Sequence, residues 1–143
     1  MTLVCPFPPE YAGDLHRWLN SPREPNFPPG QASGLETVTA MLRAKTEAGF
    51  TFAAIVDGEA VGFIGFAPAC PESGQFAGMV IAPEHRGKGW GKRFLGAVVA
   101  FLRQRGYKTM SAVVRSQNRR IQATFASAGA VPDMQVWSFR EIA

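Results

Sequence analysis

The chain has 143 residues, of which 46% are hydrophobic and 18% charged, and its formal net charge is +4. This length and this apolar share predict a single domain over residues 1–143 that buries a proper core. No apolar run reaches the ~18 residues of a membrane helix and the N-terminus does not resemble a signal peptide, so we expect a cytoplasmic protein without membrane contact.

The first third of the chain is predicted to contain one strand and two helices. Thr2–Phe7 is expected to be a strand that ends at a cluster of prolines. Apolar residues at helical spacing predict a short helix over Glu10–Asn20 and a longer one over Leu35–Ala48. Between them, Ser21–Gly34 is too rich in proline and glycine for regular structure. In this loop Phe27 could line a substrate pocket or, equally, fill the core.

Three strands are expected next. Phe50–Val56 and Ala60–Ala67 flank Asp57-Gly58, a dipeptide strongly favoured in hairpin turns. Pro68–Gly74 is predicted to be a second turn, which leads into the strand Gln75–Ile81. These short connections predict an antiparallel meander.

A glycine-rich turn after the third of these strands is the most informative stretch of the chain. Pro83 ends the strand, glycines stand at positions 87, 89 and 91, and Gly89–Arg105 has apolar residues at helical spacing. A glycine-rich turn that enters a helix N-terminus binds anions, because several N–H groups there have no intrahelical partner. Three cations accompany the turn: Arg86, Lys88 and Lys92. We therefore expect a pyrophosphate to bind here.

The glycine spacing distinguishes between nucleotide motifs. A Walker A loop requires Ser or Thr where Arg93 stands, and a Rossmann fingerprint requires its third glycine one residue later than Gly91. The remaining pattern, Arg86-x-x-Gly89-x-Gly91 after a strand and Pro83, resembles the acetyl-CoA pyrophosphate loop of the GCN5-related N-acetyltransferases (the GNAT superfamily). A surface turn that merely uses glycine is the less favoured alternative.

The C-terminal elements extend this resemblance. Tyr107–Val114 is predicted to be a strand and Asn118–Ala128 a helix, and Val131 and Met134–Ile142 supply one or two terminal strands. The order of these elements resembles that of the GNAT fold. The resemblance is firm from Phe50 to Gly129, and before Phe50 it rests on the order of the elements only. It implies an α/β (α+β) domain with four helices and a mixed central sheet of six to seven strands, in which the fourth and fifth strands run parallel and splay apart.

Basic residues are concentrated in the same region. Between His85 and Pro132 there are ten Lys and Arg residues and no Asp or Glu. Such a surface suits a polyanion, and CoA carries a pyrophosphate and a ribose phosphate. Nucleic acid is the less favoured alternative, because the anion-binding turn lies in this window and no nucleic-acid motif does.

The resemblance implies roles for the main chain. In GNAT proteins the acyl-pantetheine arm pairs with the fourth strand, so Met79, Val80 and Ile81 would bind the pantetheine amides. The Met79 N–H would face the thioester carbonyl as an oxyanion donor, a role worth roughly 3–4 kcal/mol in other acyl transfers. The diphosphate would bind the loop amides, with Arg86 as a charged partner. These loop residues are Gly87, Lys88, Gly89, Trp90, Gly91 and Lys92.

The last predicted helix carries one residue that matches the family and one that departs from it. Asn118 stands where the family has an Asn that bonds the pantetheine arm, and it also suits the N-cap. Phe125 belongs to the same cofactor site, but it replaces a Tyr that often protonates the CoA thiolate, and a phenyl ring donates no proton. Arg119 and Arg120 could equally reach the 3′-phosphate or be solvated.

No general acid or base is assigned. Gln75 replaces a Glu that serves as the base in some family members, and an amide takes up no proton at neutral pH. The remaining titratable candidates are more typical of surface residues: Glu24, Glu72, Glu84 and His85. Cys5 and Cys70 have no metal-ligand spacing and are expected to be reduced, buried thiols.

Two functions remain. The favoured one is an acyl-CoA-dependent N-acyltransferase that transfers acetyl from acetyl-CoA, without a metal, to a primary amine by direct attack in a ternary complex. The acceptor could be a small molecule, a peptide N-terminus or a protein lysine, and the protein could be a monomer or a homodimer. The alternative, motivated by Phe125 and Gln75, is a non-catalytic acyl-CoA-binding GNAT-fold sensor or interaction module.

Overall fold

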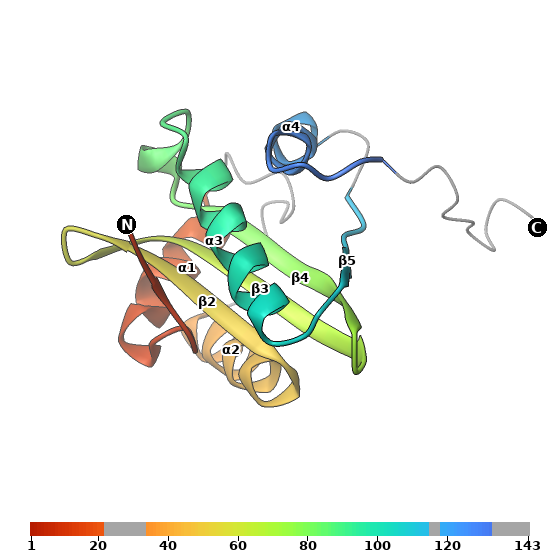
Figure 1. Cartoon of the computed structure of the whole chain (residues 1–143). Coiled ribbons are helices and arrows are strands. Elements are labelled where there is room, and N and C mark those ends of the chain that lie inside the picture. Colours follow the sequence, from red (N-terminus) through yellow and green to blue (C-terminus); the bar gives the residue numbers. More distant parts are fainter. Residues whose placement is uncertain (22–33, 115–117, 133–143) are drawn as a thin grey trace, which may run out of the picture.

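One mixed sheet organises the protein (Figure 1). The computed structural model describes residues 1–21, 34–114 and 118–132. Its strands, in sheet order, are β1 (Thr2–Val4), β2 (Phe50–Val56), β3 (Glu59–Cys70), β4 (Ser73–Ile81) and β5 (Thr109–Ser111). Neighbouring strands are antiparallel from β1 to β4, and β4 and β5 are parallel. The predicted meander and the parallel pair are thus confirmed.

The sheet is smaller than the six to seven strands expected. Five strands are present in the described part of the chain, and the strand predicted over Met134–Ile142 lies outside it. The strand predicted over Tyr107–Val114 is also shorter, since only Thr109–Ser111 pairs with β4. A β-type sequence does not by itself tell how many residues find a partner strand.

The described residues form four α-helices, the number expected. They are α1 (Ala12–Leu19), α2 (Leu35–Ala48), α3 (Trp90–Gln104) and α4 (Arg119–Ser127). Two short 3-10 helices, η1 (Pro9–Tyr11) and η2 (Pro83–His85), precede α1 and follow β4. The loop predicted over Ser21–Gly34, with Phe27, lies almost entirely outside the described residues. Within the described ranges, none of the helices combines the length and apolar character needed to cross a bilayer.

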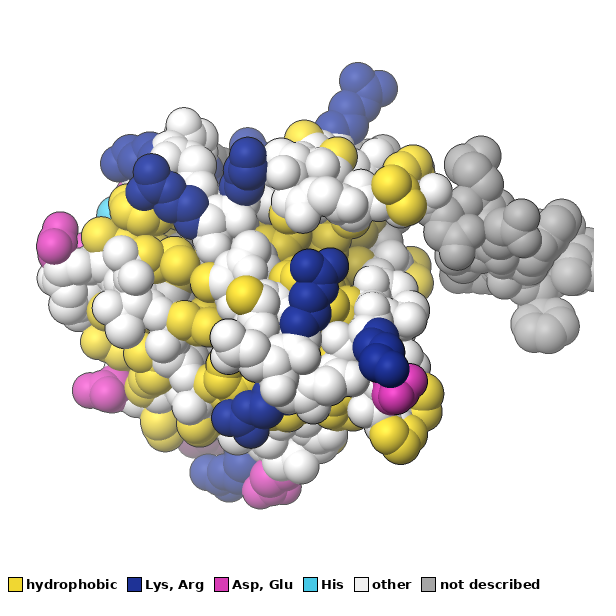
Figure 2. Space-filling model, in the orientation of Figure 1, with side chains coloured by type: hydrophobic (Ala, Val, Ile, Leu, Met, Phe, Trp, Pro, Cys, Tyr) yellow, Lys and Arg dark blue, Asp and Glu magenta, His cyan; other side chains and the backbone are white. Residues whose placement is uncertain are grey.

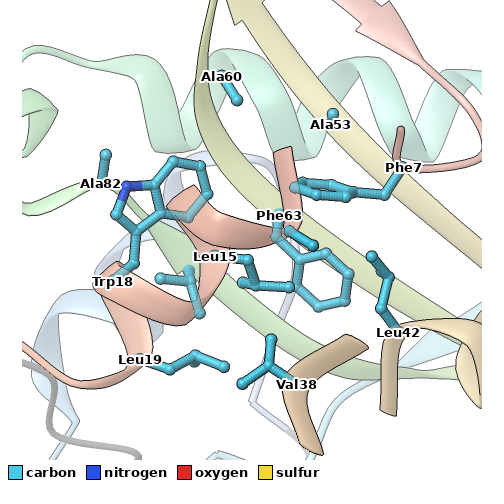
Figure 3. Packing of buried hydrophobic residues seen from close by; sticks show 12 residues of the cluster. Phe7, Leu15, Trp18, Leu19, Val38, Leu42, Ala53, Ala60, Phe63 and Ala82 are labelled. Carbon is cyan, nitrogen blue, oxygen red and sulfur yellow. The ribbon is translucent and has the colours of Figure 1, made fainter. Parts of the chain in front are cut away.

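Helices cover both faces of the sheet, which makes a three-layer arrangement (Figure 1). On one face, Phe63 of β3 packs with Leu15 and Trp18 of α1 and Leu42 of α2 (Figure 3). On the other face, the next residue, Ile64, belongs to a cluster formed with the buried side of α3. Successive side chains point to opposite faces, and both faces are covered by helices. For this reason β2 and β3 are apolar almost throughout. Burying each large apolar side chain contributes roughly 1.5–3 kcal/mol.

The two cysteines differ from expectation. Both Cys5 and Cys70 are exposed free thiols rather than buried ones. Cys5 follows the short strand β1, and Cys70 is the last residue of β3, where the chain turns towards β4. Cysteine is often buried, but a position at the end of a strand leaves the side chain in solvent here.

Candidate functional site

The central feature of the site is the point where β4 loses its neighbour. β4 pairs with β5 only at Ser73, Gly74 and Gln75, and the last pair is Gln75 with Ser111. From Phe76 to Ile81, β4 pairs with β3 alone. Among the described residues, this half of β4 therefore has no partner strand on one of its edges, as expected where β4 and β5 splay apart.

A β-bulge lies at the start of this open segment. Between the pairs Phe66–Phe76 and Ile64–Met79, β3 advances by two residues and β4 by three. The extra residue lies at Ala77–Gly78, and Gly78 has a φ of +106°. Main-chain N–H and C=O groups point alternately to the two edges of a strand. A bulge of this kind shifts that alternation by one residue, so the groups after it point to the other edge.

The alternation decides which amides face the open edge. The Ala82 N–H donates to the Val61 carbonyl oxygen at 2.8 Å, so Ala82 directs its main-chain polar groups towards β3. In an antiparallel ladder every second residue does the same, which includes Val80. Met79 and Ile81 therefore direct their N–H and C=O groups to the opposite, open edge. Met79 itself is largely buried, with 7% of its surface exposed.

The glycine turn after β4 is open and precedes α3 directly. Gly87 and Gly89 have φ values of +77° and +82°, and Gly89 is the left-handed N-cap of α3. A Cβ atom placed on either glycine would meet nothing within 4 Å. The first intrahelical bond runs from the Arg93 N–H to the Gly89 carbonyl oxygen at 3.3 Å. The amides of Trp90, Gly91 and Lys92 are therefore free of helix bonds and available to an anion.

Arg86 connects the turn to the open strand. Its Nε donates to the Ile81 carbonyl oxygen at 3.0 Å, in a partly buried position. Lys88 and Lys92 are exposed, and the guanidinium of Arg93 lies 5.2 Å from the centre of the Trp90 ring. Figure 2 shows Lys and Arg side chains around the start of α3 and on α4, whereas Asp and Glu lie towards the margins of this face. The turn thus has both backbone donors and positive charge.

Helix α4 lies beside the start of α3 and the open segment of β4. Asn118 is the N-cap of α4, is 5% exposed, and accepts a hydrogen bond from the Ile121 N–H at 3.2 Å. A Cβ atom on Gly91 would lie 3.4 Å from the Thr124 side chain, so this glycine sets how closely the two helices approach. The ring of Phe125 contacts that of Phe76 on β4. Arg119 and Arg120 are exposed.

The titratable candidates do not converge on the open edge. Glu84 forms an ion pair with Arg17 of α1, with Oε1 and Nη2 3.0 Å apart, and this pairing holds the pKa of Glu84 below its usual range. Glu72 is exposed and pairs with Lys108 at 3.3 Å. His85 is half-buried, and Glu24 lies outside the described residues. Gln75 is exposed at the last β4–β5 pair.

The described residues likewise offer no clear metal centre. No three His, Cys, Asp or Glu side chains in this part of the chain gather closely enough to hold a metal ion.

Sequence reasoning missed the bulge and the side chain that contacts it. Lys45 of α2 donates from Nζ to the Ala77 carbonyl oxygen at 3.0 Å. Glycines inside two neighbouring predicted strands, Gly65 and Gly78, were the available signal, because glycine within a strand often marks a bulge or a close backbone approach.

The comparisons with known proteins agree with this geometry. The sequence profile described as Acetyltransferase (GNAT) family matches residues 14–130. No curated protein matches the sequence significantly. Among solved structures, ribosomal-protein-alanine N-acetyltransferase from Brucella melitensis biovar Abortus 2308 is 19% identical, with a TM-score of 0.72 over 96% of this chain and 98% of that one.

Two further solved structures have the same fold. Salmonella typhimurium yncA, determined with its cofactor acetyl-CoA, is 17% identical, with a TM-score of 0.72 over 90% of this chain and 79% of that one. Aminoglycoside N-acetyltransferase AAC(6')-Iy, in complex with CoA, is 17% identical, with a TM-score of 0.69 over 96% and 93% of the two chains. At these identities the likeness establishes the fold.

Proposed function

The chain belongs to the GNAT acetyltransferase family, and we propose that it transfers an acetyl group from acetyl-CoA to a primary amine. The observation that carries the proposal is one continuous stretch: an open strand edge at Met79 and Ile81, followed by a glycine turn at the N-terminus of α3. The neighbours named above support it, since one was determined with acetyl-CoA and another with CoA.

CoA binding would use main chain along the whole stretch. The diphosphate would accept hydrogen bonds from the loop amides between Gly87 and Lys92, where the helix dipole and Arg86 favour negative charge. The pantetheine amides would pair with Met79 and Ile81 as a neighbouring strand does, with Val80 held by β3 between them. Asn118 and Phe125 on α4 would border the arm on its other side.

The chemical step would be a direct transfer. The lone pair of the neutral amine attacks the thioester carbonyl carbon, the C–N bond forms, and the Met79 N–H stabilises the charge on the carbonyl oxygen. The C–S bond then breaks, its electron pair stays on sulfur, and the amine loses its proton to water. Phe125 supplies no proton, so in this proposal CoA departs as a thiolate that is protonated by solvent.

A second function is favoured by two specific residues. Phe125 and Gln75 stand where a proton donor and a proton acceptor would be useful, and neither side chain can act as one. The same fold could therefore bind acyl-CoA without turnover, as a sensor or interaction module.

The two functions differ in amine-dependent release of CoA. We would first measure acetyl-CoA binding by calorimetry, and then follow CoA and acetylated product by chromatography with a panel of amines. The panel contains spermidine, an aminoglycoside, free lysine and a peptide with N-terminal alanine. We expect CoA release that depends on one class of amine. Binding with no release above buffer hydrolysis would favour the module, and absence of binding would overturn both functions.

A further inference from the structure

We propose that Lys45 is a positioning residue that fixes the β4 bulge and thereby the direction of the Met79 N–H. This inference rests on the proposed function, because it assigns the oxyanion contact to Met79. Lys45 lies on α2, on the opposite face of the sheet from α3, and reaches the bulge from that side.

The bulge creates a carbonyl group that needs a partner. An extra residue in one strand leaves main-chain groups outside the regular ladder, and a partly buried carbonyl without a donor is costly. Lys45 Nζ donates to the Ala77 carbonyl oxygen at 3.0 Å in a partly buried position. No carboxylate among the described residues forms an ion pair with Lys45. The charged hydrogen bond to Ala77 is therefore its main polar contact, and such bonds are stronger than neutral ones.

Two glycines make room for this arrangement, one on each strand. A Cβ atom at Gly65 of β3 would lie 2.7 Å from the Ala77 carbonyl oxygen, which is closer than side chains tolerate. Gly78 of β4 adopts a φ of +106°, which favours glycine. The carbonyl that Lys45 binds is thus accommodated from both strands.

The bulge matters for chemistry because it determines which amides of β4 point to the open edge. Along a strand, main-chain N–H and C=O groups point alternately to one edge and to the other. Losing the extra residue would therefore turn the groups that now face the open edge towards β3, and the groups that now face β3 towards the open edge. The Met79 N–H would then face β3, and the open edge would receive the amide of Val80 instead. A contact that holds the bulge in place therefore holds the proposed oxyanion donor towards the thioester.

The test compares Lys45→Met with Lys45→Arg and with Arg43→Met, which removes an exposed cation from the same helix. We expect Lys45→Met to shift the amide resonances of Gly78 and Met79 in ¹H–¹⁵N spectra and to speed their hydrogen exchange. We expect kcat to fall about tenfold, because the donor is misdirected rather than removed. The KM for acetyl-CoA should stay within about twofold. Lys45→Arg should retain most of kcat, and Arg43→Met should behave as wild type.

Several outcomes would overturn the proposal. One is a Lys45→Met variant whose Gly78 and Met79 amide resonances match those of wild type. Another is a Lys45→Met variant that loses no more thermal stability than Arg43→Met and shows no shift confined to these resonances. If Lys45→Met fails to fold, Lys45→Gln takes its place, and the same resonances decide. If wild type acetylates no amine, the proposed function fails, while the resonances still show whether Lys45 holds the bulge.

Discussion

The ring of Phe125 on α4 packs edge-on against the ring of Phe76 on β4, with centroids 5.5 Å apart and planes at 73°. Phe76 is the first residue of β4 beyond its last pair with β5. The contact therefore places α4 against the segment of β4 whose edge is open. An aromatic ring is useful at position 125 for packing alone, with or without a hydroxyl group.

Adding that hydroxyl group tests whether departure of the thiolate limits the reaction. We expect Phe125→Tyr to fold normally and to raise kcat by about tenfold or more, since a positioned general acid typically contributes at least that much. The measurement is amine-dependent CoA release between pH 6 and pH 9. Phe76→Tyr is the control, because it adds the same hydroxyl group to the other ring of the pair. Equal kcat values for Phe125→Tyr and wild type would contradict the prediction.

Local signals in the sequence predicted much of the fold. The Asp57-Gly58 hairpin is confirmed, with φ values of +49° and +78° at its two central residues. Asn118 caps α4 as predicted, and Gly89 stands at the start of α3 in a conformation that favours glycine. Each of these features depends on the preference of one or two residues for a particular backbone conformation, so the sequence contains the information locally.

Contacts between distant elements could not be predicted in this way. The bond from Lys45 to Ala77 joins α2 to β4, and neither residue has a local pattern that specifies the other. Gly62 is similar: a Cβ atom there would lie 2.9 Å from the Phe94 ring of α3, so the glycine allows the helix to approach the sheet. Such close approaches depend on which faces meet in three dimensions.

The two exposed cysteines are expected to differ in reactivity. Hydrogen bonds from the Ser73 hydroxyl and nearby main chain lower the pKa of Cys70, whose Sγ lies 2.7 Å from Ser73 Oγ. Partial desolvation raises the pKa of Cys5. Because the thiolate is the nucleophile, Cys70 should react faster than Cys5 with iodoacetamide near neutral pH.

Peptide mass spectrometry at timed intervals would measure the two alkylation rates. Ser73→Ala should slow alkylation of Cys70 and leave that of Cys5 unchanged. A Cys5 rate equal to or above that of Cys70 in wild type would show that the Ser73 contact does not control reactivity.

The ion pair between Arg17 and Glu84 is expected to make stability depend on pH. Arg17 lowers the pKa of Glu84 from its ordinary value of 4.5, so the paired carboxylate favours the folded state. The contribution is fully present above that ordinary value and is lost as the pH falls through the lowered folded-state pKa. Both side chains are about half exposed, at 56% and 47%, so the pair should contribute less than about 1 kcal/mol.

Arg17→Gln removes the partner and leaves the carboxylate in place. We expect an NMR titration to show a higher Glu84 pKa in this variant, and urea unfolding at pH 7 to show a loss below about 1 kcal/mol. Arg103→Gln is a control that removes an exposed Arg from α3 instead. An unchanged Glu84 pKa in Arg17→Gln would mean that the pair does not persist in solution.

The glycine turn allows a matched test of CoA binding. Gly89 and Gly106 both have positive φ values, +82° and +96°, and both have open space where a Cβ would stand. Alanine at either position should therefore cost a similar backbone strain of roughly 1–2 kcal/mol.

Only Gly89 lies where the diphosphate is proposed to bind. We expect Gly89→Ala to weaken acetyl-CoA binding at least about tenfold, because its methyl group obstructs the phosphate. Gly106→Ala should bind acetyl-CoA like wild type. Calorimetry would measure the affinities, and thermal unfolding would measure the loss of stability caused by the backbone strain. Equal affinities in the two variants would exclude this turn as the phosphate site, whatever the loss of stability.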